Sequence, residues 1–295
     1  MYLGDIAVER KLNKNFDDFF AKILLSIGYI LSFRTLRKKL GLQRAEFAAS
    51  GAAPIAPEVL KFFMSIGVPL FEAYGMTENC AYATSNSPEN IKIGTVGIPA
   101  HGVELKLADD GEILIRSGGV FKGYFKDDQA TSETIDKDGW LHTGDVGIYE
   151  GDFVKIIDRK RDIIITSGGK NVSPSEIENK IKVSPFIKEA IVIGDRRKFL
   201  SVLIGIEFDT VSNWALRKNI PHTTYRDLSE KQEVKDLVWK EISKANELTS
   251  SLEVREFRMI PKELDHEEGE LTATQKVKRN VLIDQFSDLI EEMYS

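Results

Sequence analysis

The sequence predicts an α/β and α+β protein with two domains, of which the first ends in a small β subdomain and the second is a compact α+β unit. Three features predict this arrangement. Within residues 1–157 the apolar residues change from a helical to an alternating period, a charged segment begins at Asp158, and strand-like and helix-like segments alternate after it. We therefore expect one domain over residues 1–157 and a second over residues 158–295.

The first 42 residues have the apolar spacing of helices. The longest apolar run, residues 23–33, has about half the length that a membrane-spanning helix requires, so we expect a helix that packs on a core. Four basic side chains follow and leave peripheral contact with an anionic membrane surface as an alternative. The apolar face contains Phe16, Phe19, Phe20, Ile23, Leu24, Ile27, Ile30 and Leu31, and the basic residues are Arg34, Arg37, Lys38 and Lys39.

The middle of the chain predicts strands and a hairpin. Residues 43–90 indicate short strands around a helix over residues 57–66, and residues 91–157 indicate the β subdomain. Residues 103–107 alternate between apolar and polar, Asp110-Gly111 is typical of a tight turn, and residues 112–116 alternate back. This pattern predicts a β-hairpin.

The second domain is expected to alternate between strands and helices. Strands are predicted over residues 162–166, 187–193 and 200–207, and helices over residues 174–182, 230–248 and 280–293. Ser173-Pro174-Ser175-Glu176 provides an N-cap serine, a proline at the first helical position and a glutamate three residues after the cap. A helix is therefore expected to begin at Pro174.

Composition excludes several classes of protein. The 295 residues are 42% hydrophobic, which suffices for a core in each domain. The net charge is −6 and no basic stripe is present, so nucleic acid is not an expected partner. Cys80 is the only cysteine, which excludes an intramolecular disulfide or a cysteine-based metal site within one chain. The start of the chain lacks the pattern of a signal peptide, so we expect a cytoplasmic protein.

Two segments of the first domain have residue types suited to a nucleotide. Gly51-Ala-Ala-Pro54 is small enough for a flat ring to approach the backbone, and in Tyr74-Gly-Met-Thr-Glu78 the tyrosine ring could stack on it while Thr77 and Glu78 offer oxygens to a phosphate-bound Mg²⁺. In Gly139-Trp-Leu-His-Thr-Gly-Asp145 a carboxylate beside a glycine could accept both hydroxyls of a ribose. Taken alone, each string is more typical of a turn.

Two further segments lie in the second domain. Ser167-Gly-Gly-Lys170 follows a predicted strand, but it lacks the spacing of a P-loop and the Ser or Thr after the lysine, so we reject that interpretation. Gly269-Glu-Leu-Thr-Ala-Thr-Gln-Lys276 places a lysine just before the last predicted helix, with Lys278 and Arg279 expected to be solvated. Asp265-His-Glu-Glu268 could bind a metal, although a solvated loop is the more usual state of such a segment.

The order and spacing of these segments resemble the adenylate-forming, AMP-binding superfamily of acyl-CoA synthetases, adenylation domains and luciferases across nearly the whole chain. Within that superfamily three strings resemble the long-chain fatty acid ligases. Other branches usually have Ser-Gly before the lysine, where this chain has Thr274-Gln275. The strings are Tyr74-Gly-Met-Thr-Glu78, Asp158-Arg-Lys-Arg-Asp162 and Leu271-Thr-Ala-Thr-Gln-Lys276.

The resemblance implies a fold and a set of roles. It implies the later part of an adenylate-forming large domain, followed by a mobile C-terminal lid domain. The adenine of ATP or AMP would be surrounded by Gly51, Ala52, Ala53, Tyr74 and Gly75. Thr77 would contact the phosphate, Glu78 would help to hold Mg²⁺, and Asp145 and Arg159 would bind the ribose.

The remaining roles implied by the resemblance concern two half-reactions. Arg161 would be the hinge about which the lid domain rotates. Lys276 would bridge the substrate carboxylate and the α-phosphate, where a compact positive charge stabilises the charge that develops during attack. After rotation the turn formed by Gly168, Gly169 and Lys170 would lie near the thiol of coenzyme A.

Two hypotheses of function follow. In the first, the chain is the C-terminal half of a long-chain fatty acid–CoA ligase with fatty acid, ATP and CoA as substrates, because family members are about twice as long and their phosphate-wrapping loop does not occur here. Such a half would need a separate N-terminal half as its partner, and it is expected to expose a sheet edge and part of its core. In the second, the chain is a catalytically silent nucleotide-binding or assembly protein that derives from such a ligase.

Overall fold

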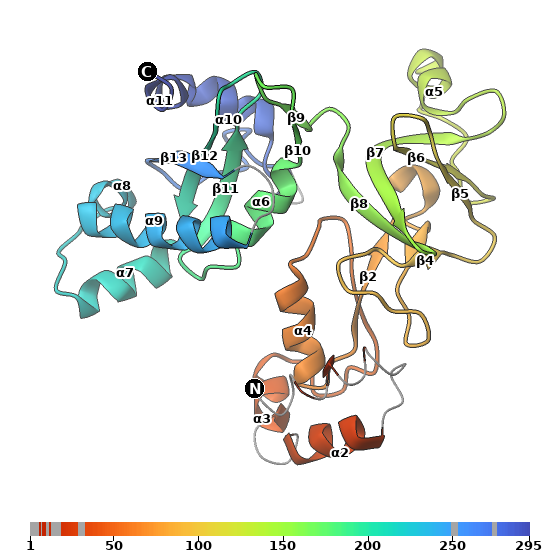
Figure 1. The fold of residues 1–295 in the computed structure, drawn as a ribbon, viewed down its shortest axis with the longest axis horizontal. Coiled ribbons are helices and arrows are strands. Elements are labelled where there is room, and N and C mark those ends of the chain that lie inside the picture. The colour runs from red at the N-terminus through yellow and green to blue at the C-terminus, as the bar shows by residue number, and fades with distance from the viewer. Residues whose placement is uncertain are drawn as a thin grey trace. The chain divides into compact units, whose positions relative to one another are not determined.

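The computed structural model describes residues 6, 8, 9, 12, 19–28, 33–248, 253–272 and 276–295. The chain divides into two compact units, Met1–Arg161 (unit 1) and Asp162–Ser295 (unit 2) (Figure 1). The division lies four residues after the boundary expected from the sequence, because Asp158 and Arg159 complete strand β8 (Phe153–Arg159) of unit 1. Within the described residues no helix is long and apolar enough to cross a membrane.

Unit 1 begins with the helices α2 (Phe19–Gly28) and α3 (Arg34–Lys39). The expectation that the large apolar side chains of the first helix pack on a core is wrong for Phe19, Phe20, Ile23 and Ile27, which are 72%, 59%, 39% and 44% exposed. The helix buries its small residues instead, since Ala21 is fully buried and a Cβ on Gly28 would meet the ring of Phe33 at 2.3 Å. Phe16, Ile30 and Leu31 lie outside the described residues.

A four-stranded sheet in the order β1-β2-β3-β4 follows. β1 and β2 are parallel and α4 connects them, as a crossover between parallel strands requires, while β3 and β4 add antiparallel pairs. The predicted helix over residues 57–66 is confirmed, with Pro57 at its first position. The bounds are β1 (Ala48–Ser50), α4 (Pro57–Ser65), β2 (Leu70–Tyr74), a 3₁₀ turn η2 (Thr77–Asn79), β3 (Thr84–Ser85) and β4 (Ile98–Pro99).

The second sheet of unit 1 is the antiparallel meander β5-β6-β7-β8. The predicted hairpin is confirmed, because β5 pairs with β6 in a register that places Leu105 opposite Ile115, and Gly111 has the positive φ of 82° that the turn requires. The sequence prediction missed the short helix α5, which Asp127 caps by accepting the amide N–H of Ala130. The bounds are β5 (Glu104–Leu107), β6 (Glu112–Arg116), α5 (Asp128–Thr134) and β7 (Leu141–Glu150).

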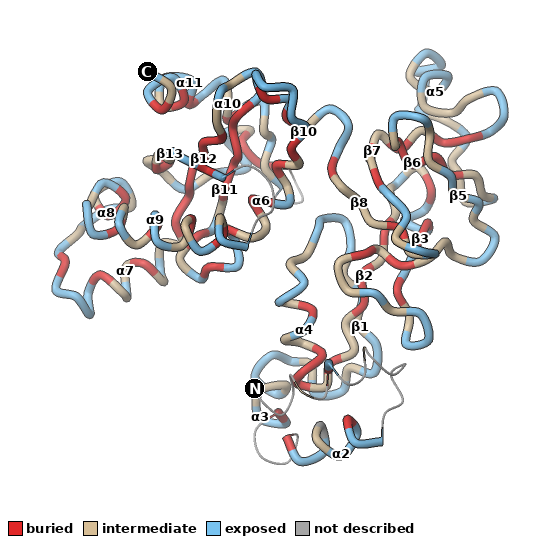
Figure 2. The backbone as a smooth tube through the Cα atoms, in the orientation of Figure 1, coloured by how far each residue is buried: buried red, intermediate tan, exposed pale blue. Residues whose placement is uncertain are grey.

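Unit 2 is built on a three-stranded sheet in the order β11-β12-β13, with a two-stranded ribbon of β9 and β10 before it. Successive residues of β12 alternate between two cores, since Val202 and Ile204 pack in one cluster and Leu203 in the other. The sheet is therefore buried on both faces, and the buried residues follow β11 and β12 in Figure 2. The strands are β9 (Ile164–Ile165), β10 (Asn171–Val172), β11 (Ile187–Ile193), β12 (Leu200–Ile206) and β13 (Val254–Met259).

The helices of unit 2 agree with the sequence prediction in part. The helix start at Pro174 is confirmed, with the Ser173 hydroxyl accepting the amide N–H of Glu176. The strand expected over residues 162–166 shrinks to β9, the final helix is two helices that meet at Phe286, and α7, α8 and β13 were not predicted. The helices are α6 (Pro174–Ile181), α7 (Phe208–Arg217), α8 (Tyr225–Glu230), α9 (Gln232–Glu247), α10 (Arg279–Gln285) and α11 (Ser287–Glu292).

Candidate functional site

Two loops of unit 1 follow the carboxyl ends of the parallel strands β1 and β2. Gly51, Ala52 and Ala53 follow β1, and the segment from Gly75 to Glu78 follows β2, so both loops leave the same edge of the sheet. In open α/β sheets this edge is where ligands bind. The structure therefore brings the first two predicted strings together, although they are about 25 residues apart in the chain.

The glycines of these loops are required by the packing of the chain itself. A Cβ on Gly51 would lie 2.9 Å from the carbonyl oxygen of Ala73, and a Cβ on Gly75 would lie 2.3 Å from the backbone of Ala81. Ala52 has a positive φ of 68°, so the backbone turns sharply after β1. All three residues of the first loop are exposed, which leaves its backbone accessible to a ligand.

Tyr74, Asp145 and Arg159 form one hydrogen-bonded cluster. The Tyr74 hydroxyl donates to Asp145 Oδ2 at 2.6 Å, and Arg159 Nε lies 3.0 Å from Asp145 Oδ1. Asp145 and Arg159 face each other in the register of β7 and β8, while Tyr74 ends β2. Three residues predicted to surround a nucleotide are thus in contact, and the side chain of Asp145 is only 9% exposed.

The environment of the cluster keeps Tyr74 protonated. Burial and the adjacent Asp145 carboxylate raise the pKa of Tyr74 above its ordinary value, so the hydroxyl keeps its proton and acts as a donor. The Tyr74 side chain belongs to one of the core clusters of unit 1, together with Ile115 and Leu141. Its predicted stacking on adenine stays a prediction.

Thr77 and Glu78 lie on the 3₁₀ turn after β2. Thr77 is exposed, and Glu78 Oε1 accepts a hydrogen bond of 2.8 Å from the Tyr124 hydroxyl, while the Glu78 carbonyl accepts the amide N–H of Phe121 at 2.8 Å. Tyr124 was missed because nothing in its sequence neighbourhood points to this contact. The turn holds one carboxylate at the carboxyl edge of the sheet.

The described residues offer Mg²⁺ a partial set of ligands. Among the described residues there is no group of three or more Asp, Glu, His or Cys side chains that could hold a metal ion. Mg²⁺ commonly keeps several waters and binds one or two carboxylates together with substrate phosphates. Glu78 therefore fits a metal ion that arrives with a nucleotide, and it does not by itself make an all-protein site. In the segment suggested as a metal site, Glu268 pairs with Lys262.

Glu112 supports the part of strand β7 that carries Asp145, and this role was not predicted from the sequence. Its Oε1 accepts the amide N–H of Gly144 at 2.9 Å, and its Oε2 accepts Lys160 Nζ at 3.1 Å. The amide N–H of Lys160 in turn donates to the carbonyl of Gly144 at 2.8 Å. Burial alone would raise the pKa of Glu112, but these hydrogen bonds lower it below its ordinary value. Glu112 thus fixes the residues next to both Asp145 and Arg159.

The other predicted residues lie at the unit boundary and in unit 2. Arg161 is exposed and is the last residue of unit 1. Gly168, Gly169 and Lys170 form the turn between β9 and β10, in which Gly169 has a φ of 75° and the amide N–H groups of Gly169 and Lys170 bond to Thr166. This ribbon turn differs from the strand, turn and helix of a P-loop, in agreement with the rejection of that interpretation.

Lys276 lies on the loop before α10 and is exposed. Its amide N–H donates to Thr272 Oγ1 at 3.0 Å and its carbonyl accepts the amide N–H of Thr272 at 2.7 Å. Lys278 is exposed as expected. The expectation that Arg279 is solvated is wrong, because its guanidinium bonds to Glu178 and is only 20% exposed. A buried acceptor on another helix cannot be seen from the local sequence.

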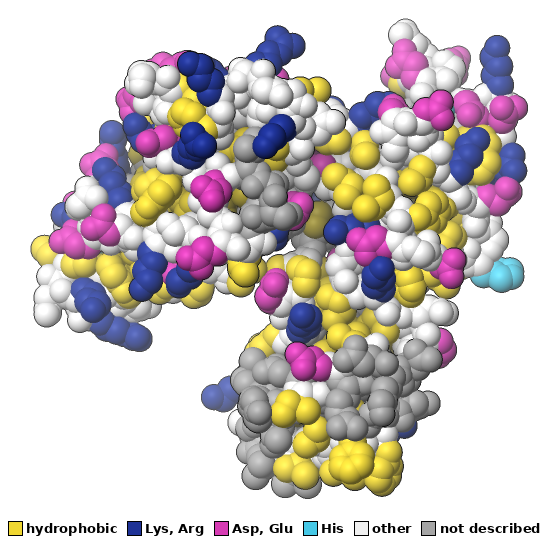
Figure 3. Space-filling view, viewed as in Figure 1, with side chains coloured by type: hydrophobic (Ala, Val, Ile, Leu, Met, Phe, Trp, Pro, Cys, Tyr) yellow, Lys and Arg dark blue, Asp and Glu magenta, His cyan; other side chains and the backbone are white. Residues whose placement is uncertain are grey.

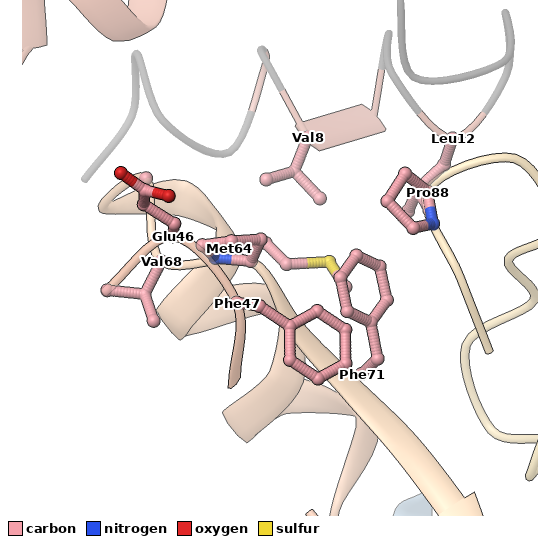
Figure 4. Close-up of a pocket in the computed structure, with 10 residues that line it drawn as sticks. Val8, Leu12, Glu46, Phe47, Met64, Val68, Phe71 and Pro88 are labelled. Carbon is pink, nitrogen blue, oxygen red and sulfur yellow. The ribbon is translucent and has the colours of Figure 1, made fainter. Parts of the chain in front are cut away.

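An apolar pocket of about 280 Å³ lies in unit 1, away from these residues (Figure 4). Phe47 directly precedes β1 and Phe71 is near the start of β2, so the pocket is at the amino edge of the sheet, opposite the two loops. Hydrophobic side chains also gather on the surface over α2 (Figure 3). The pocket is lined by Val8, Leu12, Glu46, Phe47, Met64, Gly67, Val68, Pro69, Phe71 and Pro88.

Comparisons with known families agree with the fold. The family model of the AMP-binding enzyme matches residues 18–125, and the family model of the AMP-binding enzyme C-terminal domain matches residues 161–295. The chain belongs to the AMP-binding enzyme family, which is the adenylate-forming superfamily indicated by the sequence motifs.

Curated relatives narrow the similarity to fatty acid ligases. The chain is 37% identical over 268 residues to the long-chain-fatty-acid–CoA ligase FadD15 of Mycobacterium tuberculosis, covering 90% of this chain and 44% of that protein. It is 32% identical over 290 residues to the long-chain-fatty-acid–CoA ligase ACSBG2 of Gallus gallus, covering 90% of this chain and 38% of that protein. The chain therefore spans less than half the length of these relatives.

Solved structures share the fold. The adenylation domain of a carboxylic acid reductase from Segniliparus rugosus, in complex with AMP and a carboxylic acid, matches all of this chain and 45% of its own, with a TM-score of 0.70 and 22% identity. The O-succinylbenzoate coenzyme A synthetase of Bacillus subtilis, in complex with ATP and magnesium, matches 84% of this chain and 49% of its own, with a TM-score of 0.59 and 26% identity. The predicted adenylate-forming fold is confirmed.

Proposed function

We propose that this chain carries the nucleotide-binding and lid parts of a long-chain fatty acid–CoA ligase. The reaction joins a fatty acid and ATP into an acyl-adenylate with release of diphosphate, and then transfers the acyl group to CoA with release of AMP. The observation that carries the proposal is the contact of Tyr74, Asp145 and Arg159 near the carboxyl edge of β1 and β2. These residues come from three strands, and the similarity to the fatty acid ligases supports the choice of reaction.

In this proposal unit 1 binds the nucleotide. The backbone of Gly51, Ala52, Ala53 and Gly75 and the ring of Tyr74 surround the adenine, and Asp145 with Arg159 binds the ribose. Because Tyr74 and Arg159 donate to Asp145, they hold its carboxylate in one orientation before a ribose arrives. Thr77 contacts the phosphate. Glu78, oriented by the Tyr124 hydroxyl, would hold a Mg²⁺ ion that neutralises phosphate charge.

Unit 2 acts in both half-reactions. Lys276 places a positive charge where negative charge develops as the carboxylate oxygen attacks the α-phosphorus. For the second step we propose a rotation about Arg161, the last residue of unit 1, that brings the turn of Gly168, Gly169 and Lys170 to the CoA thiol. The hydrogen bonds of the Gly169 and Lys170 amides to Thr166, at the end of the β9–β10 ribbon, support a positioning role for this turn.

A separate N-terminal half is the proposed partner of the chain. The chain matches less than half the length of its relatives, and unit 1 exposes Phe19, Phe20 and Phe47, of which Phe47 lines the apolar pocket. Such a surface is typical of a site that another protein covers. We place the enzyme in the cytoplasm. Contact at the inner membrane surface is the competing use of α2, since Arg34, Lys38 and Lys39 are exposed on the next helix.

Nucleotide binding by the purified chain tests the proposal. We expect calorimetry to detect AMP, and Asp145→Ala to weaken its affinity at least tenfold because the ribose loses its acceptor. Arg116→Ala is the matched control, because Arg116 pairs with Glu104 on β5, outside the cluster. Coexpression with the N-terminal part of a relative such as FadD15 should then give palmitate-dependent release of pyrophosphate. AMP binding without any ligase activity would favour a silent nucleotide-binding protein, and absence of AMP binding would contradict the proposed site.

A further inference from the structure

Arg279 and Glu178 form a closed network in the interior of unit 2. Arg279 Nη2 lies 2.6 Å from Glu178 Oε1, and the two side chains are 20% and 12% exposed. Arg279 Nη1 also donates to the carbonyl of Val192 at 2.9 Å, and the amide N–H of Val192 donates to Glu178 Oε1 at 2.7 Å. Both charged groups therefore bond to each other and to the same residue of β11.

This network joins the two segments of unit 2 that the proposed function uses. Arg279 is the first residue of α10 and follows Lys276 by three residues. Glu178 is on α6, which begins at Pro174, four residues after Lys170. The end of the Lys276 loop and the helix that follows the Gly168–Lys170 turn are thus fixed to one point on the central sheet.

The stem of the Lys276 loop has a second anchor. Leu271 and Val277 form an antiparallel bridge, and the amide N–H of Lys278 donates to the carbonyl of Glu270 at 2.8 Å. Glu270 is fully buried and lies 2.9 Å from Lys262. One strand of the stem is therefore held by Glu270 and the other by Arg279, while Lys276 is exposed beyond them.

We propose that the Arg279–Glu178 pair is a positioning device that holds the Lys276 loop and the Gly168–Lys170 turn in a fixed relation. This inference rests on the proposed function, because it concerns the residues used there in the two half-reactions. Three residues of chain span at most about 10 Å, so a displacement of Arg279 is transmitted to Lys276 with little slack. A misplacement of about 1 Å at a catalytic group can lower the rate about 100-fold.

A role in stability alone is the competing explanation, and it predicts different behaviour. Buried ion pairs are weak contributors to stability, and replacing both partners by apolar residues is often neutral or stabilising, whereas removing one partner strands a buried charge. The double variant Glu178→Met/Arg279→Met therefore separates the two roles. It keeps the volume and the burial, and it removes the directed bonds to Val192.

The first measurement is hydrogen exchange of the full chain, which needs no enzyme activity. In the double variant we expect about tenfold faster exchange at the amides of Lys276 and Lys278, with unchanged protection at Ile242 in the core of α9. Arg279→Lys should give a smaller increase, because a lysine keeps the charge but cannot make both bonds of the guanidinium fork. Lys278→Ala is the matched control on the same loop and should leave the exchange at Lys276 unchanged.

The second measurement is kinetic and uses the chain coexpressed with an N-terminal half. We expect the double variant to lower kcat of adenylation 10- to 100-fold with KM for ATP within about twofold, and to slow thioester formation as well, because both segments lose their common anchor. Unchanged exchange at Lys276 and Lys278, or faster exchange with unchanged kcat, would overturn the inference. A wild-type complex without adenylation activity would instead contradict the proposed function, and the exchange experiment would still decide whether the pair holds the loop.

Discussion

The two units differ in their exposed aromatic side chains and in one buried carboxyl group. In unit 2 both faces of the sheet are covered, and the buried Glu178 and Glu270 pair with Arg279 and Lys262. In unit 1 Asp145 and Glu112 are paired in the same way, but the buried Glu72 has an oxygen without a hydrogen-bond partner among the described residues, and every exposed phenylalanine of the described chain belongs to this unit. The four are Phe19, Phe20, Phe47 and Phe125.

From this difference we propose that unit 2 folds on its own and that unit 1 makes a further contact. A sheet with helices on both faces buries its own apolar surface, whereas exposed aromatic side chains favour a partner.

A pair of core truncations should have unequal effects in the two units. Leu203→Ala removes a fully buried side chain from the centre of the sheet of unit 2 and should lower its stability by about 4 kcal/mol, within the range for a closed core. Phe71→Ala in unit 1 should lower stability by about 3 kcal/mol, at the low end for a buried phenylalanine, because Phe71 is only 2% exposed but lines a pocket at the surface. Hydrogen exchange resolved by unit measures both, and equal losses would contradict the contrast.

Loss of the lysine on the anchored loop should affect one half-reaction. In the coexpressed enzyme, Lys276→Ala should lower the rate of adenylation about 10²- to 10³-fold, because a positive charge is removed from the transition state. Thioester formation from supplied acyl-adenylate should fall only modestly. Pyrophosphate exchange and acyl transfer are measured separately, with Lys278→Ala as the exposed control.

Equal losses in both steps for Lys276→Ala would indicate a folding or docking defect in place of a lost charge. Full adenylation activity would remove Lys276 from the proposed mechanism. Arg279→Ala is unsuitable as a control, because its side chain is bonded to Glu178.

The buried Glu72 carboxyl should make the stability of unit 1 depend on pH. Burial raises the pKa of Glu72 to about 7 from an ordinary value of 4.5, and a hydrogen bond from the backbone of Gly94 offsets only part of this rise. Between these values the folded state binds the proton more tightly than the unfolded state, so stability falls as the pH rises from about 4.5 to 7, by about 3 kcal/mol in total. Glu72→Gln should remove this dependence and make unit 1 more stable than the wild type at pH 8.

Urea denaturation at pH 5 and pH 8 checks the sign of the Glu72 effect. Glu178→Gln is the contrasting variant, because Glu178 has a cationic partner, and it should destabilise unit 2 at pH 8 by leaving Arg279 without its counterion. A wild-type unit 1 that is equally stable at both pH values would show that Glu72 is ionised without penalty.

The parts of this architecture that could be predicted from sequence are those with local physical causes. The Asp110-Gly111 hairpin and the capped helix at Pro174 depend on neighbouring residues, and both are confirmed. The solvation of Arg279 was wrongly predicted because its partner Glu178 is distant in the chain. The helix α5 was missed although its cap at Asp127 is local, because its short polar sequence has no apolar period. The break at Phe286 was also missed.

The candidate site divides in the same way. The motifs identified Tyr74, Asp145 and Arg159 one by one, but their mutual bonds depend on strand register, which the motifs do not contain. Glu112 and Tyr124 could not be found, since a glutamate in a hairpin strand and a tyrosine in a turn have no signature of their contacts with Gly144 and Glu78. The residues that hold a site residue in place are therefore harder to predict from sequence than the site residue itself.

Two tyrosines that donate to carboxylates show how burial changes the contribution of a hydrogen bond to stability, and removing either hydroxyl is the smallest of the substitutions considered. Tyr74 is buried and bonds to Asp145 at 2.6 Å, whereas Tyr124 is 39% exposed and bonds to Glu78 at 2.8 Å. Tyr74→Phe should lower the stability of unit 1 by about 2 kcal/mol, since the buried carboxylate of Asp145 loses a donor that water cannot easily replace. Tyr124→Phe should change it by less than about 0.5 kcal/mol, because water can replace an exposed donor.

AMP affinity gives a second comparison of the two variants. If Asp145 binds the ribose, Tyr74→Phe should weaken AMP binding more than Tyr124→Phe does, and calorimetry with AMP measures this for both variants. If Tyr124→Phe lowers AMP affinity more than Tyr74→Phe does, the result would contradict Asp145 as the nucleotide contact and would favour Glu78.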